Sequence, residues 1–428
     1  MRDPSRDRQA AGRVECLWVL GEEMFIMSRG SLMPTLVSVM RARSSRVFWL
    51  PALLLSACSE PADRPGVDQA TWRVDSVPML DIGSTADDTT EWIGIAEGVT
   101  MVGDSEIVVA DRGFAALRYF DLTGQFVRAS GRKGDGPGEF QYIARMHHCG
   151  DSLVIFELGS AAQYMVFGDA GRFGHSYRPS APPGARFEGP YKLACAPGGT
   201  FVNIGWGNEP RVNEPQRIRG TAPLWLSGGN GVPTTVLGDV PASERFARPT
   251  GSGPHPLGKE PVIAIGRTRA YYGSADSFLV QVFDLQGKPL PPIRKASVPL
   301  ATTDADRERF WLLDTLGKSP EGVAQRVRMW KDFAFPPTVP AYTAFVVDRQ
   351  DNLWVRMFPR SQENLVRWLV FSPSGEEIGS LDLPDVLAVH DIGADYVLGI
   401  ETRQDDGGQQ VRMFRLHRAK SARAGHAR

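Results

Sequence analysis

The sequence predicts an all-β protein, a six-bladed β-propeller made of four-stranded antiparallel blades. Short strands rich in Val, Ile, Phe and Tyr alternate with tight turns that contain Gly and Asp. The two clearest copies of this pattern keep one spacing, since Gly103 and Gly150 are 47 residues apart and so are Gly124 and Gly171. Periods of about 40 to 50 residues are typical of propeller blades. The 45 Gly and 32 Pro among 428 residues predict frequent turns between the strands.

Six copies of the strand pattern follow one another along the chain. We expect the second and third strands of the blades at 107–111 and 117–121, 153–157 and 163–167, 200–206 and 223–226, 270–273 and 279–287, 353–357 and 366–375, and 396–401 and 410–416. Long loops rich in Pro and Gly, at 206–222 and 240–260, leave the boundaries of the third and fourth blades open.

The sixth blade lacks an outer strand after Leu416. Residues 72–82 alternate apolar and polar side chains, and this pattern is typical of a half-buried strand. We expect this segment to supply the missing strand. Strands from both ends of the chain would then close the ring and leave no exposed edge.

Residues 303–333 predict a short helical insert between the fourth and fifth blades. Thr303 with Asp306, and Ser319 with Pro320, are start signals, and Gly317 is a stop signal. Four large apolar residues of the insert are Phe310, Leu313, Trp330 and Phe333. They could form a lid over one face of the propeller or pack as core against the blades, and their spacing favours burial.

An export signal is indicated near the N-terminus. Three arginines at 41, 43 and 46 precede an apolar run at 47–55, which is too short to span a membrane, and small residues follow it. Residues 55–58, Leu-Ser-Ala-Cys, resemble a bacterial lipobox, and this resemblance implies that Cys58 is acylated and begins the mature protein. The alternative is a chance cysteine in an ordinary signal peptide. Because 46 residues precede the apolar run, we expect translation to start at Met40.

These signals predict the organisation of the whole chain. Its segments are an upstream or disordered extension (1–39), a lipoprotein signal peptide (40–57), a tether (58–71), the propeller (72–418) and a basic tail (419–428). Two further cysteines, Cys149 and Cys195, each directly precede a similar turn in adjacent blades. In an oxidising compartment they could form a disulfide, which requires Cα atoms within about 7 Å, or remain two buried thiols.

The first blade resembles an NHL-type repeat in the sequences VADR at 109–112, RYFD at 118–121, GQF at 124–126 and GDGPGEF at 134–140. More broadly, the chain resembles the bacterial six-bladed propeller lipoproteins, with VPAY at 339–342 and NLWV at 352–355 in the fifth blade. In the order of its blades, the chain resembles this family over roughly residues 70–418. The resemblance implies a lipid-anchored protein of the bacterial cell envelope.

The charge balance argues against nucleic acid as a partner, because 48 basic and 49 acidic residues give a net charge of −1. We expect a monomer. No catalytic residue is assigned. Gly150-Asp151-Ser152 matches the nucleophile block of one hydrolase class, but Gly103-Asp104-Ser105 repeats it at the blade period, which is typical of a turn.

Acidic residues near the ends of the second strands, together with arginines beside them, are candidates for ligand binding on the channel face. These residues are Asp111, Arg112, Glu157, Asp276, Arg356, Glu401 and Arg403. Carboxylates from several blades could hold Ca or Zn in the central channel, as in some propeller lactonases and lyases, although ion pairs with the arginines are the favoured interpretation.

The sequence therefore predicts a lipid-anchored binding or scaffolding module for an envelope protein, peptide or glycan, rather than an enzyme, with no cofactor. The alternative is a propeller hydrolase, lactonase or lyase with a Ca or Zn ion in its channel.

Overall fold

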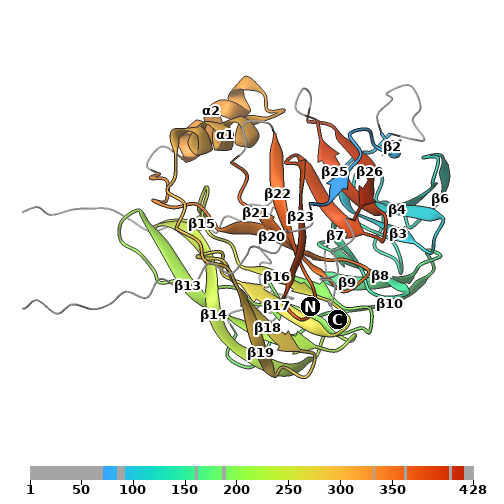
Figure 1. Cartoon of the computed structure of the whole chain (residues 1–428), viewed down its shortest axis with the longest axis horizontal. Helices are drawn as coiled ribbons and strands as arrows, with labels where there is room; N and C mark the ends of the chain where they lie inside the picture. Colours follow the sequence, from blue (N-terminus) through green and yellow to red (C-terminus); the bar gives the residue numbers. More distant parts are fainter. Residues whose placement is uncertain are drawn as a thin grey trace, which may run out of the picture.

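The computed structural model describes residues 71–83, 92–159, 162–185, 189–330, 333–360, 364–403 and 407–418. Their secondary structure consists of 26 strands and two helices, and every pairing between those strands is antiparallel (Figure 1). The predicted lipidation site Cys58, the signal peptide and the basic tail lie outside these residues. No helix in the described ranges has both the length and the apolar content to cross a bilayer.

The strands form six sheets in chain order. The first sheet contains β3 (Ala96–Val102), β4 (Glu106–Asp111), β5 (Ala116–Asp121) and β6 (Phe126–Ser130). The second contains β7 (Ile143–His148), β8 (Ser152–Glu157), β9 (Gln163–Gly168) and β10 (Phe173–Tyr177). The third contains β11 (Lys192–Cys195), β12 (Phe201–Ile204), β13 (Gln216–Ser227), β14 (Pro233–Arg248) and a fifth strand, β15 (Gly251–Pro254).

The remaining three sheets repeat the arrangement. The fourth contains β16 (Val262–Ile265), β17 (Arg269–Gly273), β18 (Leu279–Asp284) and β19 (Pro289–Arg294), and the fifth contains β20 (Tyr342–Val347), β21 (Leu353–Met357), β22 (Leu365–Phe371) and β23 (Glu377–Pro384). The sixth contains β24 (Leu387–Ile392), β25 (Tyr396–Thr402) and β26 (Gln409–His417), with β1 (Arg73–Val74) and β2 (Leu80–Ile82). The predicted second and third strands of all six copies are thereby confirmed.

The first strands of the six sheets form a closed ring. Each of β3, β7, β11, β16 and β20 contacts the first strand of the next sheet, and β24 contacts β3. This order is consistent with a propeller-like architecture.

Neighbouring sheets bury one another's faces. In β4, Ile107 and Val109 belong to an apolar cluster with the sixth sheet, whereas Val108 and Ala110 belong to a cluster with the second sheet. Because side chains alternate between the two faces of a strand, a strand covered on both faces is apolar throughout. This explains the continuous apolar sequence of β4.

The N-terminal segment closes the ring, as predicted. Both β1 and β2 pair with β26, with Arg73 opposite His417 and Leu80 opposite Met413. The guanidinium of Arg418 lies 4.8 Å from the Trp72 ring centroid, so the two ends of the described chain also meet through side chains.

The helices α1 (Asp304–Thr315) and α2 (Pro320–Met329) lie between β19 and β20 in the chain, at one side of the molecule in Figure 1. Thr303 and Ser319 cap them, as predicted. The Phe333 ring packs on Phe246 of β14, with centroids 5.3 Å apart. Trp330 is 6% exposed, but Leu313 is 45% exposed, so the expected burial is wrong for Leu313. In α1 only Asp306 is buried and in α2 no residue is, so the apolar side chains on these helices stay at least partly exposed.

Candidate functional site

Asp111 and Glu157 occupy equivalent positions, as the last residues of β4 and β8. The Asp111 carboxylate accepts hydrogen bonds from the backbone N–H groups of the two residues directly before β3, at 3.0 and 3.1 Å. The Glu157 carboxylate does the same for the two residues directly before β7, at 3.0 Å each. Burial raises the pKa of Glu157, and hydrogen bonds from the backbone N–H groups of Gly159 and Gln141 oppose the shift. Both carboxylates therefore hold the segment that leads into the first strand of their own sheet.

The other predicted site residues also have polar partners within the protein. The Arg112 guanidinium lies 3.1 Å from the Glu97 carboxylate and over the Tyr142 ring. Arg356 donates to the Thr343 hydroxyl at 2.8 Å. The remaining pairs are Asp276 with Arg219 at 2.6 Å, Glu401 with Arg412 at 2.7 Å, and Arg403 with the Gly83 carbonyl at 3.5 Å.

The structure distributes the seven candidates over the first, second, fourth, fifth and sixth sheets and the connections next to them. Within the described part of the chain, no three His, Cys, Asp or Glu side chains are grouped so that they could hold a metal ion. The role of the seven residues in ligand binding stays a prediction.

Cys149 and Cys195 form a disulfide, with Cα atoms 5.6 Å apart. Cys149 directly follows β7 and Cys195 ends β11, so the bond joins the first strands of the second and third sheets. It lies at the ring of first strands, where neighbouring sheets are in contact.

A small pocket lies at one end of the third sheet, where several connections meet. Its lining residues are Tyr191, Gly205, Trp206, Gly207, Glu209, Ala242, Ser243, Arg245 and Pro261. Tyr191 directly precedes β11, Trp206 follows β12, and Arg245 lies on β14. The β14 strand supplies one wall. It pairs with β13 along almost its whole length, and near Arg245 it also pairs with β15 on its other side.

The pocket combines aromatic rings with paired charges. The Tyr191 and Trp206 rings have centroids 4.9 Å apart, and the Lys192 ammonium lies 5.4 Å from the Tyr191 ring centroid. The Arg245 guanidinium lies 2.7 Å from the Glu209 carboxylate. Its cavity volume is about 10 Å³, enough for about one water molecule, so it offers a ligand the rings and charged groups at its rim.

A second ion pair borders the same pocket. The Glu260 carboxylate accepts a hydrogen bond from the Ser243 hydroxyl at 2.7 Å, and the Lys192 ammonium lies 3.3 Å from it. These contacts fix the direction of the polar groups around the rings. The sequence did not predict this pocket. The long loops expected at 206–222 and 240–260 border it, but the expectation is wrong for 216–222, which belong to β13, and for 240–248 and 251–254, which belong to β14 and β15. The strands accommodate Gly and Pro at irregular pairings, such as the one at Gly220.

No family model matches the chain, and no curated protein matches it either. Among solved structures, the chain is similar to a member of the DUF4221 family from Bacteroides vulgatus, with 10% identity and a TM-score of 0.47, over 82% of this chain and 100% of that one. It is also similar to a "Putative exported protein" from Bacteroides fragilis, with 9% identity and a TM-score of 0.42, over 84% of this chain and 98% of that one.

Proposed function

We propose that this chain is a six-bladed β-propeller lipoprotein of the bacterial cell envelope that binds a protein, peptide or glycan ligand. The observation that carries the proposal is the pocket of Tyr191, Trp206, Glu209 and Arg245 at the end of the third sheet. Binding residues are commonly placed on loops that a rigid scaffold holds in position. Here the six sheets are the scaffold and the connections around β11, β12 and β14 are the loops.

The composition of the pocket supports recognition rather than packing alone. Tyr191 and Trp206 are half-buried, so part of each ring remains accessible to a ligand. Aromatic side chains provide large contact areas, and Tyr and Trp also carry a polar group. The Glu209–Arg245 and Glu260–Lys192 pairs add acceptors and donors on two sides of the rings.

Replacement of Trp206 by alanine is expected to abolish ligand retention without unfolding the protein. Peptide and glycan arrays would be probed with the wild-type chain and the Trp206→Ala chain. Loss of the large ring should weaken binding by at least about tenfold, because aromatic residues in pocket centres often contribute more than about 2 kcal/mol. Trp92→Ala is the matched control, since Trp92 is 50% exposed and lies next to the first sheet, away from the pocket.

Retention that is unchanged in Trp206→Ala would reject the pocket as the binding site. Conversion of a retained peptide or glycan into a product, together with stoichiometric Ca or Zn in the purified protein, would instead favour the enzyme alternative.

The lipid anchor makes a separate prediction. Acylation requires the Cys58 thiol, so the Cys58→Ala chain should move from the membrane fraction to the soluble fraction when cells are fractionated. The loss should be large, because the acyl chains on Cys58 supply the membrane affinity under this proposal. Ser45→Ala is the matched control, because it changes a residue of the same predicted signal peptide and keeps the Cys58 thiol, and it should leave the distribution unchanged. Membrane retention of Cys58→Ala would refute lipid anchoring.

A further inference from the structure

Two of the first strands carry basic side chains on the inner side of the ring. Arg145 and His147 are two residues apart on β7, so they share one face of that strand, while Met146 between them packs in the core of the first and second sheets. His390 lies on β24. Both β7 and β24 contact β3, which places the three residues on strands at either side of β3.

The exposure of these residues indicates that they face the axis of the ring. Arg145 and His390 are exposed and His147 is half-buried, although all three lie within the innermost strands of their sheets. Arg145 and His147 lie opposite Phe156 and Val154 of β8, on the face of the second sheet that is turned toward the third sheet. Because β7 belongs to the innermost ring of strands, the exposed parts of these side chains open toward the ring axis.

The three groups are close enough to affect one another's ionisation. Burial lowers the pKa of His147 to about 3, and the charge of Arg145 and then His390 add to the shift. Burial is the larger cause that lowers the pKa of His390 to about 4, and the positive charge of Arg145 is the smaller one. The negative charge of Asp391 opposes the shift. The His390 side chain is more exposed than that of His147. Water around His390 therefore counteracts the lowering of its pKa by burial. At neutral pH, both rings are therefore uncharged beside one guanidinium.

Arg145 has no acidic partner among the residues that the structure describes. Among the described residues, neither its guanidinium nor the rings of His147 and His390 have a hydrogen-bond or ion-pair partner. The other charged groups on the first strands are already paired, as Glu97 with Arg112, Lys192 with Glu260, His148 with Asp169, and Asp391 with Arg349. The strands β16 and β20 carry no charged residue. Arg145 also acts on Tyr164 of β9, since burial raises the pKa of Tyr164 and the charge of Arg145 opposes that shift.

We propose that Arg145, His147 and His390 form a binding site on the ring axis for an oxyanion, such as the carboxylate or phosphate group of a ligand. A guanidinium presents two parallel N–H donors that match the oxygens of these groups, and each imidazole can add an N–H donor. Binding of a negative group favours the protonated imidazoles, so the affinity should rise as the pH falls. This site is distinct from the pocket of Trp206, and the two proposals fail independently.

The test uses the full chain and sulfate as the probe, because sulfate keeps its charge between pH 8 and 5. Calorimetric titration should show binding that tightens from pH 8 to pH 5. Arg145→Gln should weaken it by at least about tenfold, as expected for loss of a charge-assisted hydrogen bond. His147→Gln and His390→Gln should each reduce the pH dependence. Acetate and methyl phosphate, compared at pH 7, distinguish a carboxylate ligand from a phosphate ligand.

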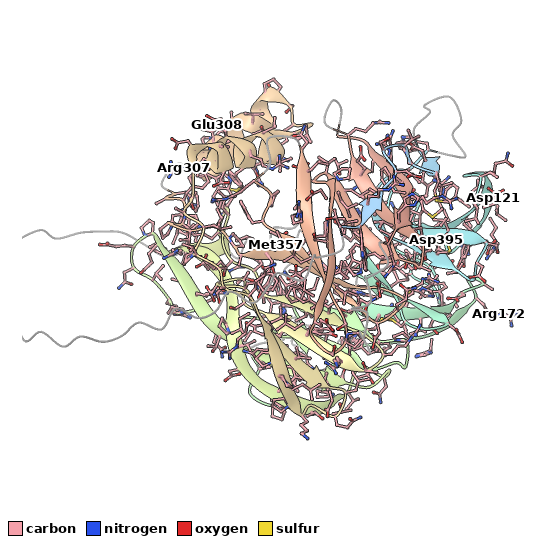
Figure 2. The ribbon with its side chains drawn as sticks, in the orientation of Figure 1. Asp121, Arg172, Arg307, Glu308, Met357 and Asp395 are labelled. Carbon is pink, nitrogen blue, oxygen red and sulfur yellow. A yellow bond between two sulfur atoms is a disulfide. The ribbon has the colours of Figure 1, made fainter. Side chains whose placement is uncertain are left out.

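The matched control is Arg172→Gln, because Arg172 is exposed at the outer edge of the same sheet in Figure 2. It should leave the sulfate affinity unchanged. A second readout, histidine titration by NMR, does not depend on ligand binding. The pKa values of His147 and His390 should rise in Arg145→Gln, because a neighbouring positive charge is removed. Equal sulfate affinities of the wild-type, Arg145→Gln and Arg172→Gln chains would overturn the proposal.

Discussion

Reduction of the Cys149–Cys195 disulfide is expected to lower the free energy of unfolding by about 4 kcal/mol at 25 °C. The two cysteines are separated by 46 residues in the sequence, so the bond closes a long loop in the unfolded chain. A crosslink over such a loop removes conformational entropy from the unfolded state, and that entropy returns when the bond is broken. The bond also joins β7 to β11, so its loss frees the contact between the second and third sheets.

Denaturant unfolding of the chain from Ser59 onward, with and without reductant, measures this difference. This chain contains only Cys149 and Cys195, so the denatured protein should show no free thiols before reduction and two afterwards. The Cys149→Ala/Cys195→Ala chain is the control, since reductant should not change its unfolding midpoint. Two free thiols in the untreated protein, or equal midpoints in both conditions, would contradict the expected stabilisation.

The second and third strands of each sheet were predictable because their sequences are apolar on both faces. In β4, each of the residues 107–110 is fully buried between two sheets, and continuous apolar runs of this kind are easily recognised. The first strands were not assigned from the sequence. The β7 sequence Ile-Ala-Arg-Met-His-His mixes apolar and basic residues, because Met146 packs in the core with the first sheet while Arg145 and His147 lie on the opposite face and are only partly covered.

The candidate site was less predictable than the fold, because its residues meet through long-range contacts. Trp206 and Arg245 come together only because β13 and β14 form a hairpin that extends past the sheet. The sequence shows acidic residues at the ends of second strands, yet their spacing does not reveal what they bind. Asp111 bonds the N–H groups of residues 16 and 17 positions earlier in the chain, which no periodic pattern indicates.

Replacement of Asp111 by alanine is expected to destabilise the protein by about 3 to 5 kcal/mol, as is usual when one partner of a buried ion pair is removed. The Asp111 side chain is fully buried, and its carboxylate lies 3.3 Å from the guanidinium of Arg118, which is 4% exposed. Burial lowers the pKa of Arg118, and the charge of Asp111 opposes that shift. Without Asp111, the Arg118 charge remains buried without its counterion.

Denaturant unfolding of Asp111→Ala, Asp111→Asn and the double variant Asp111→Ala/Arg118→Met separates the contributions. Asparagine keeps an oxygen for the N–H groups before β3 and should cost less stability than alanine, while removal of both charges should restore part of the loss. Asp121→Ala is the control, because Asp121 lies in a turn at the outer edge of the same sheet (Figure 2) and should have a much smaller effect. If Asp111→Ala unfolded at the wild-type denaturant concentration but lost a bound ligand or metal, Asp111 would be a ligand-binding residue and not an anchor of the segment before β3.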